Sequence, residues 1–339
     1  MKIQMSRQGY KQGSNFLGPL FVFLVVVSLP FLGLPANSGA ADWPAKPITL
    51  IVPWSAGAST DLTARIMAAK MSQILRVPIQ VVTKPGGSGM IGTLDVMQSQ
   101  PDGYTLLVDC GGTSSIQYAW AKDLPYKVED RTYIARIMYS PFSMIVPASS
   151  PWKTVDDLVK AIRRDPSAIS FGGIGGTGVP DVCIAQFKDA LMKKGVDVSK
   201  TRLITYKGTG EVMPAIAGGH VKVSFASPPS ATALMDAGKL RPLAVTSPQR
   251  HKGWPSVPTM TESGFPSVDL SYWAGLGGPP DTPANIVKIL DNAVKEALKD
   301  SEVISKLDKI GGVPAYQPGD QYQKFVLDEG DSIKALKLK

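Results

Sequence analysis

Short apolar runs rich in β-branched residues alternate with helix-spaced apolar positions along most of the chain. Residues 48–52 (ITLIV) are mostly apolar and rich in β-branched side chains, which predicts a strand, and residues 61–75 carry apolar side chains at helical spacing. The strand pattern returns at 79–82 and 104–108, with a short helix expected at 92–98 between them. Strand–helix–strand alternation of this kind predicts βαβ units and a parallel sheet.

The same alternation restarts after residue 141. A helix is expected over 154–163, because Thr154 is a capping residue and two aspartates follow in the first turn, where the helix dipole favours acids. The other expected elements are strands at 144–146, 169–171, 203–206, 221–225 and 243–245, and helices at 179–193, 210–217, 230–237, 283–299, 301–310 and 319–338. Helices remain at the C-terminus after the second unit, and such helices commonly pack back on the first unit. We therefore expect the chain to cross between the two units twice, with the two crossover strands forming a hinge. The expected domains are a discontinuous first lobe (42–141 plus 268–339) and a second lobe (142–267).

Residues 1–41 predict export from the cytoplasm. Three basic residues and no acid precede an apolar run at 16–34, and small residues follow it. This is the pattern of a secretory signal peptide, which we expect to be cleaved near Ala40 or Ala41 to give a periplasmic protein. The alternative is a permanent anchor, which needs about 20 apolar residues; Pro30 interrupts the run.

Charge and reactive side chains narrow the class of function. The net charge of +8 falls to +5 without the three bases of the signal peptide, and bases and acids are interspersed, so no nucleic-acid partner is expected. Neither His220 nor His251 lies near a cluster of acids or cysteines, which argues against a metal site and against a Ser-His-Asp triad. Cys110 and Cys183 lie in different halves of the chain, and we expect two free thiols. No cofactor is expected.

Three loops rich in Gly, Ser and Thr follow predicted strands and precede helices, at 53–61, 85–89 and 172–178. Ligands of open α/β sheets bind at the carboxyl ends of strands, where the N-terminus of a helix offers free amides to an anion. Ordinary helix capping is the alternative for each loop taken alone. Two matches to G-x-G-x-x-G, at 87–92 and 173–178, lack an acid at the end of the next strand, so a dinucleotide is not expected.

Single residues near these loops have two interpretations each. Lys207 follows a predicted strand and either pairs with a ligand carboxylate or is solvated. Trp54 and Trp273 either form an apolar wall of the cleft or belong to the core. Asp61 is expected to hold the first loop in place without contacting the ligand, because two carboxylates repel each other.

The chain resembles the solute receptors of tripartite tricarboxylate transporters, the Bug family of periplasmic binding proteins, over essentially its whole length after residue 41. The segments that carry the resemblance are Trp43-Pro44, Pro47 to Pro53, Ala56 to Asp61 with Ala64-Arg65, Lys84 to Gly92, Pro101 to Leu107, Leu124-Pro125-Tyr126, Tyr206-Lys207-Gly208, Ala237 to Ser247 and Val257-Pro258-Thr259.

The resemblance implies a type II periplasmic-binding-protein fold, an α/β fold in which two Rossmann-like lobes are joined by two hinge strands. It implies a receptor without catalytic activity that is a monomer, binds a small mono- or dicarboxylate and delivers it to membrane permease subunits. The ligand-binding residues that it implies are Trp54, Ser55, Ala56, Gly57, Ala58, Ser59, Thr60, Gly87, Ser88, Thr113, Ser114, Ser115, Gly175, Gly176, Thr177, Tyr206, Lys207, Gly208 and Ala226.

Two departures from the family pattern bear on the ligand. Ala226-Ser227 stands where the family typically has Asp-Asn, and the missing acid argues against an amino-acid ligand. Asp181 adds an acid near the cleft, which is awkward for a bulky anion. Two other functions stay open at this point: a sensory protein that feeds a membrane kinase, and a secreted α/β serine hydrolase with Ser114 or Ser115 as nucleophile.

Overall fold

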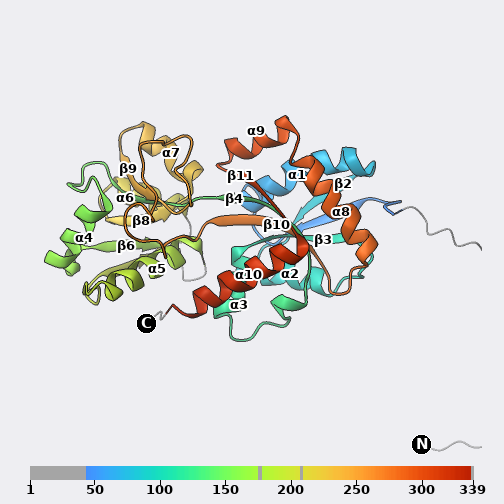
Figure 1. Cartoon of the computed structure of the whole chain (residues 1–339), viewed down its shortest axis with the longest axis horizontal. Coiled ribbons are helices and arrows are strands. Elements are labelled where there is room, and N and C mark those ends of the chain that lie inside the picture. Colours follow the sequence, from blue (N-terminus) through green and yellow to red (C-terminus); the bar gives the residue numbers. More distant parts are fainter. Residues whose placement is uncertain (1–42, 175–177, 207–208, 337–339) are drawn as a thin grey trace, which may run out of the picture. The chain divides into compact units, whose positions relative to one another are not determined.

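The computed structural model describes residues 43–174, 178–206 and 209–336, and they form an α/β protein with two sheets (Figure 1). The first sheet has the strand order β11-β4-β10-β3-β1-β2. Its strands are β1 (Ile48–Val52), β2 (Ile79–Thr83), β3 (Thr105–Cys110), β4 (Thr132–Ser140), β10 (Tyr272–Gly278) and β11 (Val313–Pro318). β1 pairs in parallel with β2 and β3, whereas β10 is antiparallel to β3 and β4.

The second sheet has the order β7-β6-β8-β5-β9. Its strands are β5 (Ser143–Pro147), β6 (Ser170–Gly173), β7 (Arg202–Thr205), β8 (Val223–Ala226) and β9 (Leu240–Val245). β6 is parallel to β7 and β8, and β5 is antiparallel to β8 and β9. The predicted βαβ units and parallel strand pairs are therefore present, and the strands at the crossings between the sheets add antiparallel pairs.

Helices cover both sheets, and we call each sheet with its helices a lobe. The helices of the first lobe are α1 (Ser59–Leu75), α2 (Met90–Met97), α3 (Ser115–Trp120), α8 (Ala284–Ala297), α9 (Ser301–Lys309) and α10 (Gly319–Lys334). Those of the second are α4 (Val155–Arg164), α5 (Val179–Lys193), α6 (Thr209–Ala217) and α7 (Pro228–Asp236). Short 3-10 turns are η1 (Gly87–Gly89), η2 (Gly111–Thr113), η3 (Val128–Asp130) and η4 (Pro166–Ala168).

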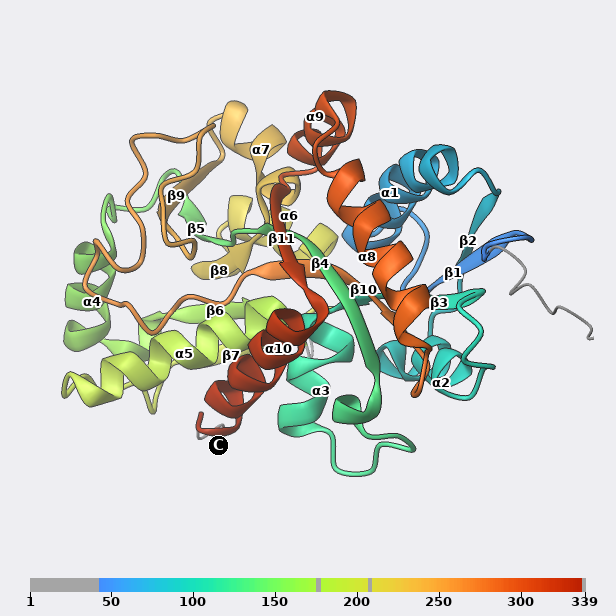
Figure 2. The same cartoon turned by 45° about the vertical axis from the view of Figure 1, so that its right-hand side comes forward.

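The chain passes between the sheets twice (Figure 2). β4 ends in the first sheet at Ser140 and β5 begins in the second at Ser143. After β9 the chain returns as β10, which lies between β3 and β4 in the centre of the first sheet. Residues from both ends of the chain therefore build the first sheet, while a single continuous segment builds the second.

Apolar faces of the helices build one main core in each lobe. Met67 and Met71 of α1 pack with Leu50 of β1 and with Leu290 of α8 in the first lobe. In the second lobe Phe171 of β6 packs with α4 and α5 side chains. Ile116 of α3 and Ile333 of α10 also belong to that second core, so the first lobe contributes side chains to it.

Helix α4 confirms the prediction that Thr154 caps its N-terminus. The Thr154 hydroxyl accepts a hydrogen bond from Asp157 N at 3.1 Å, and the Asp157 carboxylate accepts one from Thr154 N at 3.0 Å. This reciprocal pair satisfies two amides that the first helical turn leaves free. Among the described residues, no helix is both long and apolar enough to cross a membrane.

Candidate functional site

The loop before α1 is held by the first turn of that helix. Gly57 has a φ of +80°, and its amide donates to Asp61 Oδ2 at 2.8 Å. Arg65 Nη2 lies 3.0 Å from Asp61 Oδ1, one turn along the helix. Burial raises the pKa of Asp61, but the hydrogen bonds from Arg65 and Gly57 outweigh it, so the pKa is below its usual value. Asp61 is almost fully buried, and Ser55 to Gly57 are exposed.

Trp54 brings three predicted loops of the first lobe together. Its indole nitrogen donates to Cys110 Sγ at 3.1 Å. A Cβ at Gly112 would lie 2.8 Å from the indole ring, and one at Gly89 would collide with Thr113. These two glycines are therefore required by close approach of the loops, and the loops at 54–60, 87–89 and 111–115 meet around one half-buried ring.

The hydroxyls of Thr113 and Ser114 are committed to the interior. Thr113 Oγ1 donates to Asp109 Oδ1 at 2.8 Å, and Ser114 Oγ lies 2.7 and 2.6 Å from the two Asp109 oxygens. Arg131 Nη1 is 2.7 Å from Asp109 Oδ2, and both side chains of this ion pair are fully buried. Tyr322 donates to the same carboxylate at 2.9 Å. In this structure both hydroxyls therefore bond within the protein, and both residues are fully buried.

Ser115 joins the same loop to the C-terminal helix. Its hydroxyl donates to Glu329 Oε2, which also accepts a hydrogen bond from Trp273 Nε1 at 2.7 Å. Burial raises the pKa of Glu329 to about 7, although the two hydrogen bonds and the nearby Arg136 oppose this effect. Trp273 is 1 % exposed, which places it in the core and not in a cleft wall.

Thr60 is tied to the strand that returns from the second lobe. Tyr272 Oη donates to Thr60 Oγ1 at 3.0 Å, and Thr60 is buried. Ala58 and Ser59 are partly exposed at the start of α1, and Gly87 and Ser88 are exposed. Gly87 and Ser88 line a pocket of about 340 Å³ together with Gln117 and Trp120.

The predicted residues of the second lobe follow the carboxyl ends of β6, β7 and β8, which share one edge because these strands are parallel. Tyr206 is partly buried after β7, and Ala226 is fully buried at the end of β8. The Ala226 side chain is thus a core methyl group. The positions Gly175, Gly176, Thr177, Lys207 and Gly208 lie outside the described residues.

Asp181 repeats in the second lobe what Asp61 does in the first. Both are the third residue of their helix, α5 and α1. Both Asp181 oxygens lie 3.1 Å from Ile174 N, and the side chain is 7 % exposed. The Asp181 carboxylate therefore bonds to the loop that precedes its own helix, as that of Asp61 does.

The N-termini of three helices at these loops have no side-chain cap among the described residues. Ala58 occupies the cap position of α1, Gly178 that of α5 and Ser227 that of α7, and none makes a capping hydrogen bond. By contrast α4 and α9 are capped by Thr154 and Asp300. The first loop therefore has no side-chain cap within the described chain, and the free amides at the start of α1 carry a partial positive charge.

Sequence reasoning missed the buried acids and bases behind the site. Asp109 ends the apolar run of β3, and an acid at the end of a strand was a usable signal. Arg131, Glu329 and Tyr322 come from distant segments whose patterns give no sign that they meet. Cys110 and Cys183 are both buried and unpaired, as expected. In the described part of the chain no three His, Cys, Asp or Glu side chains are grouped for a metal.

Two lobes with crossing strands and uncapped, glycine-rich loops at strand ends are the architecture of a two-lobed solute-binding receptor. Residues 63–338 match the model of the tripartite tricarboxylate transporter family receptor, and the chain belongs to that family. It is therefore a receptor and not an enzyme, and the hydrolase hypothesis is dropped.

Known proteins agree with this assignment. A protein from the TAR-I ttuE-ttuC' intergenic region of Agrobacterium vitis is 33 % identical over 309 residues, which are 90 % of this chain and 86 % of that protein. The periplasmic binding protein BugD has a TM-score of 0.71 at 27 % identity, covering 87 % of this chain and 97 % of BugD. The expected fold, that of a periplasmic binding protein, is thereby confirmed.

Two solved relatives contain a ligand. MatC of Rhodopseudomonas palustris with bound malate has a TM-score of 0.72 and 25 % identity, covering 86 % of this chain and 99 % of MatC. A second R. palustris protein, with adipate, has a TM-score of 0.73 and 28 % identity, covering 86 % of this chain and 95 % of that protein.

Proposed function

We propose that this receptor binds a small organic mono- or dicarboxylate between its two lobes and delivers it to the membrane subunits of a tripartite tricarboxylate-type transporter. The observation that carries the proposal is the uncapped N-terminus of α1, where Ala58 leaves the amides of the first turn without a side-chain partner. Two relatives of the same family hold dicarboxylates, malate and adipate.

The chemistry of the first-lobe loops suits a carboxylate. A helix N-terminus supplies amide donors and a partial positive charge, and an anion there is stabilised without a nearby lysine or arginine. Asp61 and Asp181 are each hydrogen-bonded within their own loops, so neither opposes an anion in the cleft with a free carboxylate face. The proposed contacts are the amides and exposed hydroxyls of the first loop (53–61), together with Ser88 and Tyr206.

We propose that amino acids are not ligands of this receptor. Ala226 ends β8 as a buried methyl group, at the position where the family pattern has an acid suited to an amino group. We also propose that the lobes are 42–141 plus 268–339 and 142–267, that the protein is a monomer, and that the signal peptide is removed near Ala40 or Ala41.

The test is isothermal titration of the purified protein with malate, adipate, benzoate and acetate. Adipamide serves as the uncharged control and lysine as the amino-acid control. We expect saturable heat with at least one carboxylate and none with adipamide or lysine. Absence of heat from every carboxylate, or equal heat from adipamide, would overturn the proposal.

A further inference from the structure

A pocket of about 390 Å³ lies in the second lobe, at the end of its sheet opposite to the predicted ligand loops. Pro147 ends β5, while Ile169 directly precedes β6 and Lys222 directly precedes β8. Because β6 and β8 are parallel, their starts and their carboxyl ends lie at opposite edges of the sheet. A ligand in this pocket is therefore separate from any ligand between the lobes.

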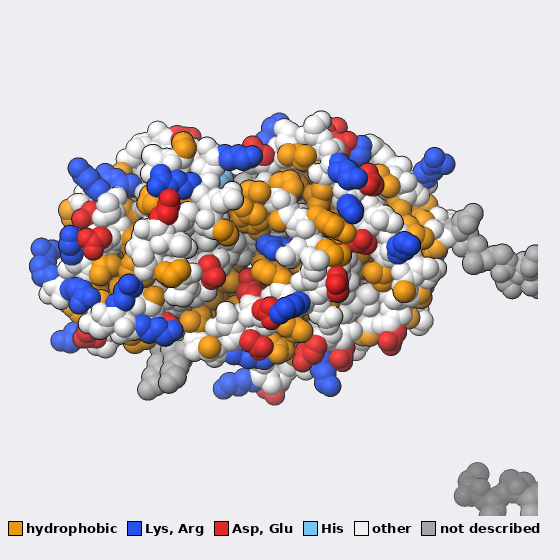
Figure 3. Space-filling view, in the orientation of Figure 1, with side chains coloured by type: hydrophobic (Ala, Val, Ile, Leu, Met, Phe, Trp, Pro, Cys, Tyr) orange, Lys and Arg blue, Asp and Glu red, His pale blue; other side chains and the backbone are white. Residues whose placement is uncertain are grey.

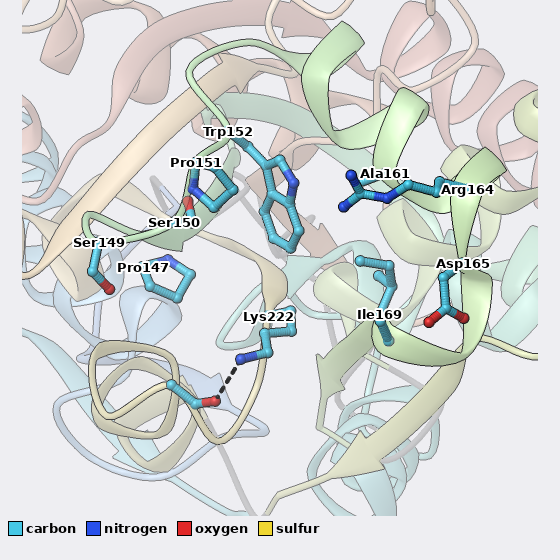
Figure 4. A pocket seen from close by; sticks show the side chains of 12 residues that line it. Pro147, Ser149, Ser150, Pro151, Trp152, Ala161, Arg164, Asp165, Ile169 and Lys222 are labelled. Carbon is cyan, nitrogen blue, oxygen red and sulfur yellow. Dashed lines mark hydrogen bonds between the residues drawn. The ribbon is translucent and has the colours of Figure 1, made fainter.

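An aromatic ring and two cations line this pocket. Figure 4 shows the Trp152 indole reaching into it, with the Arg164 guanidinium directed toward the ring and Lys222 on the other side of the cavity. Trp152 is partly buried, so that one part of the ring packs on the core and another lines the pocket. Pro147 and Pro151 add apolar surface.

The wall that carries Trp152 is held in place from behind. Arg241 of β9 donates to the carbonyl oxygens of Ala148 at 2.8 Å, Ser150 at 3.3 Å and Trp152 at 2.9 Å. These charge-assisted hydrogen bonds fix the whole turn. Such a fixed wall is what a preformed binding site requires, since ordering a loop on binding costs affinity.

Polar groups in the pocket lack partners among the described residues. Ser150 Oγ is a buried oxygen without a hydrogen bond. Arg164 has no hydrogen bond or ion pair in the described chain, and Lys222 Nζ donates only to Gly219 O at 3.2 Å. The one acid present, Asp165, accepts hydrogen bonds from Ser167 N and Oγ at 3.0 and 2.6 Å. The pocket therefore offers positive charge to an incoming anion, whereas the Ser150 hydroxyl lies beneath its surface.

The charge of the surrounding segment has the same sign. Residues 142–267 contain 15 Lys and Arg against 9 Asp and Glu, a net charge of +6, so the rest of the exported chain is slightly acidic. Figure 3 shows Lys and Arg side chains predominating at the outer end of this lobe. A field of this sign attracts anions to that end.

We propose that this pocket is a second ligand site, for a small aromatic carboxylate. The ring packs against the Trp152 indole, and Arg164 and Lys222 supply the positive charge that attracts the carboxylate. A cavity of this size accommodates a single ring with its substituents, and aromatic surface with few polar groups is typical of small-molecule sites. The proposal does not depend on which ligand binds between the lobes.

The test follows Trp152 directly by ¹⁹F NMR of the protein labelled with 5-fluorotryptophan, with benzoate as the probe. The chain has 6 tryptophans, and Trp152→Phe assigns the resonance of Trp152. We expect benzoate to shift this resonance saturably, at concentrations well below those needed with acetate or benzyl alcohol. The Trp54 resonance reports the cleft separately, so failure of the cleft proposal leaves this result unaffected.

Variants identify the charges responsible. Arg164→Gln/Lys222→Gln should raise the half-saturating benzoate concentration roughly tenfold, because it removes two charged donors. The matched control, Lys160→Gln/Lys193→Gln, removes two exposed charges of the same lobe outside the pocket and should leave it unchanged. A Trp152 resonance that does not move with benzoate, or that moves equally with acetate and benzyl alcohol, overturns the proposal. Equal loss in the control pair also overturns it.

Discussion

The fully buried Asp109–Arg131 pair shows how single residues position the first-lobe loops. Asp109 accepts hydrogen bonds from Thr113, Ser114 and Tyr322, so one carboxylate anchors the turn after β3 to α10. Removing Arg131 would leave this carboxylate buried without its counter-charge, which typically costs about 3–5 kcal/mol. The pair therefore fixes the loop at 111–115, which contains the predicted ligand-binding residues Thr113, Ser114 and Ser115. Neither Asp109 nor Arg131 itself faces the cleft.

Asp61 gives a prediction at the same scale. Asp61→Ala should lower the free energy of unfolding by about 1–2 kcal/mol, because the Gly57 amide loses its acceptor. It should also weaken carboxylate binding, since the loop amides lose their orientation. The folded-state pKa is lowered, so the contribution of Asp61 is present above the ordinary pKa of 3.8 and is lost as the pH falls through the folded value. Chemical denaturation at pH 7 and pH 3 measures both effects.

Arg65→Gln is the matched control for this experiment, because it leaves the bond from Gly57 to Asp61 in place. Its ligand affinity should stay within about twofold of wild type, the range of an exposed ion pair. An Asp61→Ala protein with unchanged affinity and unchanged stability would remove Asp61 from the site.

Glu329 gives a prediction of opposite sign. Its pKa is raised to about 7, so between pH 4.5 and 7 the folded state binds a proton that the unfolded state has released. Stability from this group therefore falls as the pH rises through that window. Glu329→Gln keeps an acceptor for Trp273 and Ser115 but does not titrate. The difference in unfolding free energy between Glu329→Gln and wild type should shift by about 2 kcal/mol in favour of the variant when the pH rises from 5 to 8. The shift is smaller than full burial implies, because the side chain borders a water-accessible cavity.

Asp328→Asn, at the neighbouring exposed acid paired with Lys324, controls for a general loss of charge. Its stability relative to wild type should not change between the two pH values. Equal pH profiles for Glu329→Gln and wild type would show that Glu329 titrates normally.

Sequence reasoning selected loop residues that the structure leaves exposed, and it missed the buried residues behind them. Ser55 and Ser88 were selected because Gly, Ser and Thr before a helix are visible in one short segment, and both are exposed. Ser114 was assigned to the ligand through the family resemblance, and in the structure its hydroxyl bonds to Asp109. That partner is close in sequence, but its burial depends on Arg131 and Tyr322, which only the folded chain brings near.

At the scale of elements, the absence of a cap on α1 is the feature most informative for function. Thr154 and Asp300 cap α4 and α9, whereas α8 and α10 begin without a side-chain cap from the described residues, as α1 does at Ala58. The start of α1 is distinguished by its place after the carboxyl end of β1, beside an exposed loop. Ligands of α/β sheets bind at that end of the strands, where free amides can meet an anion.

Ala58→Asp tests this trade directly. The new carboxylate should cap α1 and raise the free energy of unfolding by about 1 kcal/mol. It should also occupy the position proposed for the ligand carboxylate and lower affinity at least tenfold, by repulsion and by competition for the amides. Thermal melts and titration calorimetry measure the two changes on one sample. Thr154→Ala is the counterpart: it should lose about 1 kcal/mol and leave affinity unchanged. A stabilised Ala58→Asp protein with full affinity would refute the role of this helix end.

Two of the strands that sequence patterns missed, β10 and β11, contain residues that strand propensity disfavours. β10 has the sequence YWAGLGG, and a Cβ at Gly275 would collide with the Tyr322 ring, so packing requires a glycine that strand propensity disfavours. β11 contains Pro314 and Pro318, which a strand tolerates because it lies at the edge of the sheet. β4 and α3 were missed as well. The predicted helices and parallel strands were found because their periodicity is local.

At the scale of the whole molecule, the lobes are joined by more than two strands. Ile116 and Ile333 belong to elements of the first lobe but pack in the core of the second. Gln186 of α5 also contacts Asp269, in the segment that returns to the first sheet, at 3.1 Å. Unfolding of the two lobes is therefore expected to be coupled.

Ile333→Ala tests that coupling. Loss of this fully buried side chain should cost about 2–4 kcal/mol. Wild type should unfold in one transition by both far-UV circular dichroism and tryptophan fluorescence, whereas the variant should show separated transitions. Val303→Ala removes a side chain confined to the first-lobe core, and it should lower stability without separating the lobes. Two transitions in wild type would contradict the coupling.

The place of β10 in the middle of the first sheet sets an order of assembly. A chain that emerges from a membrane N-terminus first presents β1 to β4 early, but the gap between β3 and β4 is filled only by residues 272–278. All strands of the second sheet emerge before then. The lobe that begins first is therefore completed last, and its two inner strands wait with unpaired edges that invite association with other chains. During export, the interval between the emergence of β4 and that of β10 is when this receptor most needs protection from aggregation.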